Sequence, residues 1–276
     1  MTLSLNREQL GLLMYVHVNM PWNMLHRYRE IILQIPMNIE IGFAAEDLER
    51  VRAPEFQAAA DALHERGCAV TMHGPFWDLC PGSLDPLIRQ ASQHRLRQFF
   101  ELTKVFEPLQ VVCHTGFDPR HHRGHRKVWV ENSVAAWEPL VKAAEERKTP
   151  LLLENVWEAG PEIHRELIDR IGSPWLGFCL DVGHQHSFSS TSLDAWLEAM
   201  SDRLKEIHLH DNDGTQDAHL PVGRGTIDFE VLFDFLVRKG ETPVLTLEPH
   251  TDEHLTASLE GVRRFVQERV HRLWPS

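Results

Sequence analysis

Eight short apolar runs, one in about every 34 residues of this 276-residue chain, limit the folds that the sequence can adopt. Each run is followed by a polar or Gly/Pro break and then by a segment with helical periodicity. Strands that alternate with helices predict an α/β protein with a parallel sheet. Eight such units predict a closed (β/α)8 barrel. The runs are 12–20, 38–43, 69–76, 111–117, 150–156, 176–184, 206–212 and 243–250.

The segments between the runs predict the outer helices, and several of them end at Gly or Pro. A doubly wound open sheet is the alternative architecture, but it usually carries a glycine-rich loop after its first strand. The residues Met20–Asn23 are not glycine-rich. No linker or low-complexity tract divides the chain, so we expect a single domain over residues 1–276. The helices are expected over 45–67, 87–106, 130–148, 229–240 and 255–270.

Composition narrows the class of partner. The net charge of −12 disfavours duplex DNA, because a phosphate backbone requires a basic surface. No apolar run reaches the roughly 18 residues of a membrane-spanning helix, and no secretory signal pattern opens the chain. The four cysteines lack CxxC spacing, and Cys113 and Cys179 lie inside apolar runs. We therefore expect reduced core thiols in a cytoplasmic protein. The oligomeric state is left open.

Histidines and acids gather where the apolar runs end, and histidine is abundant, with 18 residues against two tyrosines. A single histidine at a strand end is usually a hydrogen-bonded core or rim residue. In a barrel, however, all the strands end at one mouth, where active sites lie. Buried carboxylates also need a compensating cation. The recurrence at six strands predicts a metal centre suited to Zn, Mn, Fe or Co rather than Ca. The nine groups are His73, His114, Glu154, Asp181, His184, His208, Asp217, His219 and Glu248.

Seven motifs between His73 and Glu248 resemble the xylose isomerase-like TIM barrels. This superfamily includes sugar phosphate isomerases and epimerases, and phosphodiesterases of the endonuclease IV type. The resemblance is specific for the superfamily and less specific for the reaction. The motifs are HGPF (73–76), HTG (114–116), LLLEN (151–155), CLDVGH (179–184), HLHDN (208–212), DAHLPVGRGTIDF (217–229) and TLE (246–248).

The resemblance to the isomerases and epimerases implies one divalent metal. Its ligands would be Glu154, Asp181, His208 and Glu248. The two glutamates would move a proton by general acid/base catalysis, and His184 would contact a substrate oxygen. Those members commonly carry an arginine after the seventh strand, where this chain has Asp217-Ala-His219.

The endonuclease IV pattern implies two or three metals per chain, with Zn or Mn foremost. One would be bound by His73, His114 and Glu154. Glu154 would bridge to a second, bound also by Asp181, His208 and Glu248. A third would be bound by His184, Asp217 and His219. Two metals about 4 Å apart can stabilise the attacking and leaving oxygens of a phosphoester.

The full set of nine groups favours hydrolysis of a phosphoester in a small, sugar-containing substrate that is expected to be phosphorylated. A sugar (phosphate) isomerase or epimerase with Glu154 and Glu248 as its acid/base pair is the alternative. A metal-dependent binding protein without catalysis is the second alternative.

Four residues are candidates for contact with substrate: Arg224, Trp77, Arg123 and His17. Each also has a plainer interpretation as a surface or core residue. The basic segment 117–129 is expected to be a loop, either a solvated one or a positive lip that grips a phosphate or carboxylate. Glu40 is expected either to contact substrate or to form a rim salt bridge. His210 and Asp211 are expected to orient ligands or to cap their loop.

Overall fold

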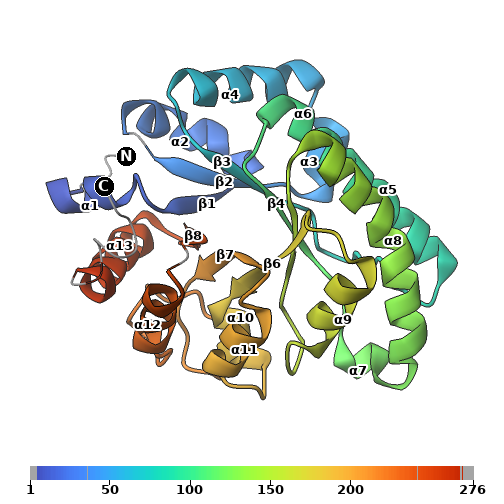
Figure 1. Ribbon diagram of the computed structural model, residues 1–276. Coiled ribbons are helices and arrows are strands. Elements are labelled where there is room, and N and C mark those ends of the chain that lie inside the picture. The colour runs from blue at the N-terminus through green and yellow to red at the C-terminus, as the bar shows by residue number, and fades with distance from the viewer. Residues whose placement is uncertain (1–4, 36, 241, 268, 270–276) are drawn as a thin grey trace.

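The strands form one closed parallel barrel in which each strand pairs with the next and β8 pairs with β1 (Figure 1). The computed structural model describes residues 5–35, 37–240, 242–267 and 269. All eight predicted strands are confirmed, and the fold is the expected (β/α)8 TIM barrel. The strands are β1 (His17–Pro21), β2 (Asn38–Gly42), β3 (Val70–His73), β4 (Val111–His114), β5 (Leu151–Glu154), β6 (Leu176–Asp181), β7 (Leu204–Leu209) and β8 (Val244–Leu247).

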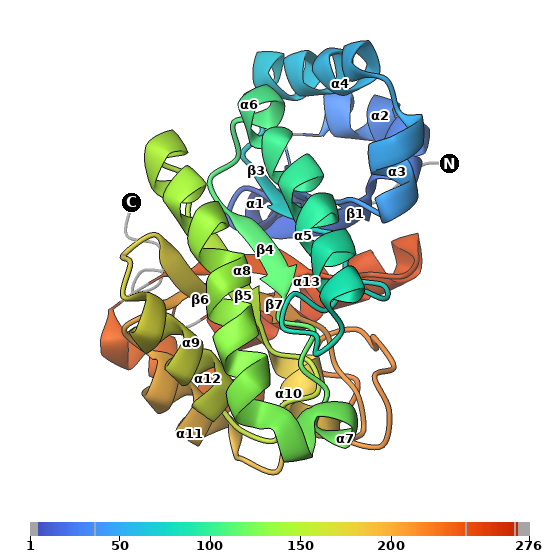
Figure 2. The same cartoon turned by 90° about the vertical axis from the view of Figure 1, so that its right-hand side faces the viewer.

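The helices surround the barrel, and Figure 2 shows α7 and α10 at the end toward which β4 points. That end is the mouth. The longer helices are α2 (Trp22–Gln34), α4 (Ala53–Glu65), α5 (Pro86–Glu101), α8 (Arg126–Arg147), α9 (Glu162–Ile171), α11 (Leu193–Met200), α12 (Phe229–Lys239) and α13 (Asp252–Val266). The shorter ones are α1 (Arg7–Leu12), α3 (Ala45–Arg50), α6 (Thr103–Phe106), α7 (Pro119–His122), the 3₁₀ turn η1 (Arg123–His125) and α10 (Val182–Phe188).

Three predicted segments differ from the structure for local reasons. The expected helix 45–67 is two helices, because the chain is extended at Val51 and Arg52 and Pro54 starts a new helix. The expected helix 87–106 is divided into α5 and α6. The expected loop 117–129 is largely helical, since α7, η1 and the first turn of α8 occupy it. The part of helix 255–270 at residues 268 and 270 lies outside the described residues.

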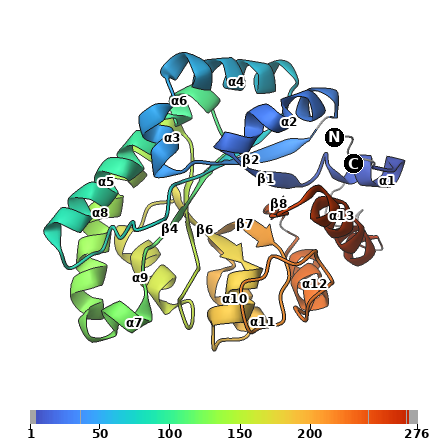
Figure 3. The same ribbon diagram turned by 180° about the vertical axis from the view of Figure 1, so that it is seen from behind.

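The main apolar core lies between the sheet and the helices, and a small cluster of Val112, Leu152 and Cys179 fills part of the barrel interior. All four cysteines are free, and Cys113 and Cys179 are buried, as expected. Figure 3 shows α1 beside α13, so the first and last described helices are in contact. Within the described residues, none of the helices combines the length and apolarity needed to span a membrane.

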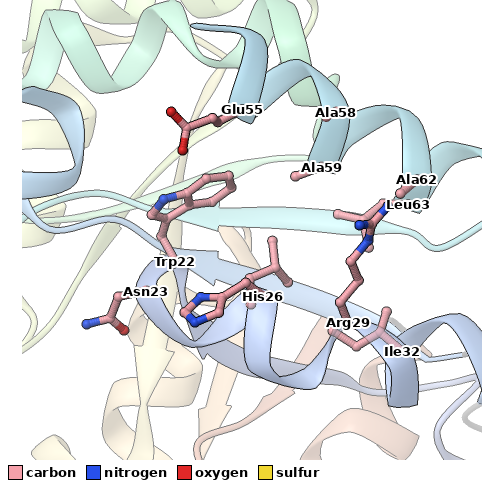
Figure 4. A pocket seen from close by; sticks show the side chains of 11 residues that line it. Trp22, Asn23, His26, Arg29, Ile32, Glu55, Ala58, Ala59, Ala62 and Leu63 are labelled. Atoms are coloured by element: carbon pink, nitrogen blue, oxygen red, sulfur yellow. The ribbon is translucent and has the colours of Figure 1, made fainter. Parts of the chain in front are cut away.

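A groove of about 370 Å³ runs between α2 and α4 on the outer wall of the barrel. Figure 4 shows Trp22 and Glu55 toward one end, and Arg29 near Ile32 and Leu63 at the other. The nine predicted metal ligands do not line it. The groove is therefore a feature separate from the barrel mouth.

Candidate metal centre

Three of the predicted ligands meet around one carboxylate at the ends of β3, β4 and β5. Glu154 is 1% exposed, and its Oε2 lies 2.9 Å from His73 Nε2 and 3.1 Å from His114 Nε2. Barrel register aligns His114 with Glu154 on neighbouring strands. The Nδ1 atom of His73 donates to the Gly74 carbonyl at 2.9 Å, which leaves Nε2 directed at the carboxylate.

The corner between β6 and α10 adds two more predicted ligands. Asp181 ends β6 and caps α10, because its Oδ1 accepts a hydrogen bond from the backbone N–H of His184 at 2.6 Å. His184 Nδ1 donates to the Asn155 carbonyl at 3.0 Å, and its Nε2 lies 3.3 Å from Asp217 Oδ2. The Asn155 side chain in turn holds the Asp181 backbone through two hydrogen bonds of 2.9 Å.

Two histidines of the β7 region point into the barrel, because alternate residues of a strand face the same side. His208 is fully buried, and its Nδ1 lies 3.4 Å from Glu154 Oε1 and 3.2 Å from Glu248 Oε1. His210 lies nearer the mouth, and its Nε2 is 3.1 Å from Asp181 Oδ1. A Cβ at Gly183 would lie 1.9 Å from His210 Cε1, so this ring can occupy its place only beside glycine.

The loop after β7 carries Asp217 and His219 and is held by Asp211. The fully buried Asp211 carboxylate accepts hydrogen bonds from the backbone N–H groups of residues 212, 223, 225 and 227, at 2.8–3.2 Å. This arrangement brings His219 Nε2 to 3.1 Å from Asp217 Oδ2 and stacks the His219 and His210 rings at 3.8 Å. His219 has a φ of 45°, in the left-handed region that few non-glycine residues adopt.

The imidazoles and carboxylates of the centre shift each other's pKa strongly. Burial lowers the pKa of His73, but the hydrogen bond and charge of Glu154 outweigh it and raise the pKa to about 9. Burial also lowers the pKa of His219, but Asp217 and Glu248 outweigh it and raise the pKa to about 9. For Glu154, burial favours the neutral acid, yet the facing imidazoles hold its pKa well below the usual range. Protons on histidine thus balance the buried carboxylates.

Several buried atoms of the centre lack a hydrogen-bond partner in the described part of the chain. They are both ring nitrogens of His208, Nδ1 of His210 and of His219, and Oδ1 of Asp217. His208 Nε2 faces Glu40 Oε2 at 3.4 Å, and the other atoms face Glu154, Glu248 or one another, as His210 Nδ1 and Asp217 Oδ1 do at 3.6 Å. Buried polar atoms without partners are costly, and a shared cation would satisfy them. The donors therefore fit divalent metals that accept nitrogen and oxygen.

Four groups of three described residues have candidate ligand atoms within 4.8 Å of one another. They share residues, so they form one continuous cluster rather than separate sites. The groups are His73, Glu154 and His208; Asp181, His184 and His210; His210, His219 and Glu248; and Glu40, His208 and Glu248. All nine residues predicted from the sequence thus lie in this cluster or, for His114 and Asp217, within 3.3 Å of it.

The four predicted substrate contacts are placed less uniformly. Trp77 is 77% exposed beside Phe76, whose ring stacks on His114. Arg224 is exposed in the loop that Asp211 holds. His17 is not at the mouth, because it begins β1 and hydrogen-bonds to Ile39 and Thr71. The side chain of Arg123 lies outside the described part of the structure.

The basic segment 117–129 carries less free charge than its sequence indicates. Asp118 pairs with both Arg120 and His121, at 2.8 and 3.0 Å, and Arg126 pairs with Glu166 at 2.8 Å. A phosphate at this segment would have to compete with those carboxylates.

Two residues of the centre lie closer to the candidate ligands than the sequence indicates. His210 is itself a member of two of the four candidate ligand groups, not only a neighbour that orients them. Glu40 is fully buried inside the barrel, and its Oε2 faces His208 Nε2 at 3.4 Å, so it is not a rim residue. The alternation Glu206, His208, His210 could have indicated that all three share one face of β7.

Comparison with known proteins places this geometry in a family. Residues 38–268 match the family described as Xylose isomerase-like TIM barrel. The chain is 25% identical over 205 residues to the uncharacterized protein MJ1311 of Methanocaldococcus jannaschii, a match that covers 72% of this chain and 70% of that protein. It is 25% identical over 195 residues to a probable endonuclease 4 of Mycobacterium leprae, covering 66% and 73%.

Two solved structures share the fold over nearly all of their length. The TTHB071 protein from Thermus thermophilus, from a crystal soaked with ZnCl2, has a TM-score of 0.77 and 25% identity, covering 92% of this chain and 98% of that one. A D-tagatose 3-epimerase-like protein has a TM-score of 0.80 and 21% identity, with the same coverage. The chain belongs to the family of xylose isomerase-like TIM barrels.

Proposed function

We propose that this protein is a metal-dependent enzyme that epimerises or isomerises a sugar by moving a proton at a carbon next to a carbonyl. The observation that carries the proposal is the placement of two carboxylates around one point. Glu154 Oε1 and Glu248 Oε1 lie 3.4 and 3.2 Å from the same atom, His208 Nδ1. A pair of converging carboxylates can take a proton and return it, which is what such a reaction requires.

The residues of the centre have separate roles in this proposal. Glu154, Asp181 and Glu248 would hold a divalent cation together with His208 or His210, each of which belongs to two of the candidate ligand groups. When bound, the cation would polarise a substrate oxygen as a Lewis acid. Glu154 and Glu248 would exchange the proton. His184 would donate a hydrogen bond to a substrate oxygen. Burial lowers the pKa of His184, but Asp181 and Asp217 outweigh burial and raise it. The structural neighbour described as epimerase-like supports this assignment.

Solvent proton exchange tests the proposal. The metal-loaded protein would be incubated with a panel of ketoses and ketose phosphates in heavy water, and deuterium incorporation followed by NMR or mass spectrometry. We expect incorporation at the carbon next to the carbonyl for at least one sugar, and a loss of at least about 100-fold in Glu154→Gln and Glu248→Gln. Glu131→Gln, on the exposed face of α8, is the matched control and should retain the activity. A panel without any incorporation contradicts the proposal.

Hydrolysis of a phosphoester is the second candidate, favoured by the gathering of all nine groups in one continuous cluster. The similarity to a probable endonuclease 4 points the same way. The carboxylates that pair with Arg120 and Arg126 in segment 117–129 weigh against it. Metal analysis separates the two, since one metal per chain favours the epimerase and two or three favour the hydrolase. Release of nitrophenol from bis(4-nitrophenyl) phosphate would establish the hydrolase directly.

A binding role without catalysis predicts a different result. In that case neither assay should show turnover, and Glu154→Gln should alter only the metal content.

A further inference from the structure

Two pairs of aromatic side chains border the metal centre on one side of the mouth. In the loop after β3, the Phe76 ring stacks on His114 with centroids 4.5 Å apart and an interplanar angle of 25°. Trp77 continues outward from Phe76, with centroids 5.2 Å apart. Phe76 is 38% exposed and Trp77 is 77% exposed. An aromatic surface therefore begins on a candidate metal ligand and extends into solvent.

The second pair borders His184, the neighbouring candidate ligand. Phe188, the last residue of α10, lies 6.0 Å from the His184 ring, and Trp157 packs on Phe188 with centroids 4.3 Å apart. Trp157 is 38% exposed, and the Arg120 guanidinium lies 4.8 Å above its ring. The His114 and His184 rings are themselves 6.1 Å apart. We call the four residues Phe76, Trp77, Trp157 and Phe188 the aromatic rim.

The opposite side of the mouth is polar. There the loop after β7 and the end of β8 present Asp217, His219 and Glu248, with His250 stacked on His219 at 4.3 Å. A molecule that spans the mouth thus meets acids and imidazoles on one side and flat apolar rings on the other. Tryptophan and tyrosine concentrate binding energy at recognition surfaces because their rings are large and rigid.

We propose that the substrate is a sugar that carries a ketone on its ring, next to the carbon that exchanges its proton, and that is joined to a planar aromatic group. The sugar lies at the carboxylates and imidazoles, and the planar group stacks on the aromatic rim. The inference rests on the proposed function for the position of the sugar. A sugar placed at His114 and His184 reaches Phe76 and Phe188, but the indoles of Trp77 and Trp157 lie one ring further out. A substrate can contact these two indoles only through a second group beyond the sugar. Because indole rings stack best on flat rings, that group should be planar.

Binding of matched compounds tests the inference. The metal-loaded full chain would be titrated calorimetrically with adenosine and D-ribose, and with 4-nitrophenyl β-D-glucopyranoside and D-glucose. We expect the ring-bearing member of at least one pair to bind about 10-fold or more tightly than its ring-free partner. An advantage confined to adenosine identifies a nucleoside, and one confined to the nitrophenyl compound identifies an aryl glycoside.

Variants assign that advantage to the rim. Trp77→Ala and Trp157→Ala should each weaken binding of the ring-bearing compound by about 5- to 100-fold while leaving the metal content and the ring-free sugar unaffected. Leu109→Ala is the control, because Leu109 is 54% exposed but precedes β4, at the opposite end of the barrel. Its affinities should match those of the unsubstituted protein.

Three outcomes overturn the inference: equal affinities within both pairs, an advantage that survives both tryptophan substitutions, or no binding of any of the four compounds at millimolar concentration. A change of oligomeric state in Trp77→Ala would instead assign the rim to contact between copies of the chain, and would also overturn it. Deuterium exchange with ring-free ketoses reports separately on the proposed function. Deuterium exchange together with equal affinities for ring-bearing and ring-free compounds would contradict only the aromatic substrate. Tighter binding of the ring-bearing compounds without deuterium exchange would contradict only the proposed reaction.

Discussion

The two halves of the barrel interior beneath the metal centre differ in chemistry. Below the ligands of β4, β5 and β6 lie Val112, Leu152 and Cys179, all fully buried and apolar. Below the ligands of β7, β8 and β3 lie Glu206, Thr246 and Thr71, also fully buried. Beneath the candidate ligands, one half of the barrel interior is thus an ordinary apolar core. The other half is a set of hydrogen-bonded polar side chains, which we call the polar column.

The polar column is internally paired. Glu206 accepts hydrogen bonds from Thr246 at 2.5 Å and from Gln110 at 2.8 Å, and Glu40 accepts one from Asn19 at 2.8 Å. His208 stands between Glu40 below and Glu154 and Glu248 above. The apolar half therefore supports its ligands by packing alone, whereas the polar half supports them by charge. Substitutions in the two halves should affect metal binding differently.

The largest effect is expected from His208→Leu, which breaks the polar half. It leaves Glu40 without its facing imidazole, and breaking a buried ion pair typically costs about 3–5 kcal/mol. Urea denaturation of the metal-free protein measures this loss of unfolding free energy. Metal affinity should fall as well, because His208 belongs to two of the four candidate ligand groups. A loss below about 1 kcal/mol would show that the column is not held by charge.

Leu152→Ala is the counterpart in the apolar half. Removing a buried leucine side chain should cost about 3 kcal/mol in the same urea experiment, through lost burial and the cavity that remains. Glu154, two residues further along β5, keeps its contacts with His73, His114 and His184. Metal affinity of the folded variant, measured by competition with a chelating dye, should therefore stay within about 3-fold of the original. A much larger loss would contradict the separation of the two halves.

The pH dependence should depend on whether metal is bound. In the metal-free protein His73 and His219 have pKa values of about 9 against an ordinary 6.5. Their stabilisation is complete below pH 6.5 and is lost as the pH rises through 9. Metal binding displaces these protons, so the rise in melting temperature on adding Zn²⁺ or Mn²⁺ should grow over the same interval. A metal-induced shift that shrinks with pH would refute this.

The smallest effect is expected from Glu206→Gln. Burial and the nearby charge of Glu40 raise the pKa of Glu206 to about 8, so at pH 7 the carboxyl group is mostly neutral in the folded protein. Because Glu206 ionises at lower pH in the unfolded chain than in the folded protein, it lowers the free energy of unfolding progressively from about pH 4.5 to pH 8. The uncharged amide of Glu206→Gln removes this loss. The variant should match the original protein at about pH 5 and become progressively more stable than it as the pH rises toward 8. Equal pH profiles would mean that Glu206 is ionised when buried.

The fold could be predicted because its signal is local and repeated: each strand is an apolar run followed by a break. The helices α1, α2, α9, α10 and α11 were not among the expected ones, and for α10 the reason is local. The start of α10 lies inside the apolar run 176–184, and only the cap formed by Asp181 reveals where the strand stops.

The site could be predicted in part. Parallel strands bring their ends together, so residues at those ends could be named without coordinates. The depth of a residue within the barrel is different, because it depends on strand stagger. Glu40 was therefore expected at the rim but lies inside the barrel, and His17, a candidate for substrate contact, has its alternative place in the core. The distinction between His208 and His210 also required the coordinates, since both face inward from the β7 region.

The hydrogen bond at the end of β6 links the cluster to the start of a helix. The carboxylate of Asp181 is at once the first anchor of a seven-residue helix and a candidate ligand, and the anchoring atom is Oδ1. A metal ion that coordinates Oδ1 weakens the hydrogen bond from the backbone N–H of His184 and so destabilises the first turn of α10. A metal ion that coordinates Oδ2 leaves that hydrogen bond in place. Titrating metal into the protein while recording far-ultraviolet circular dichroism would therefore reveal which oxygen coordinates, from whether the helical signal moves.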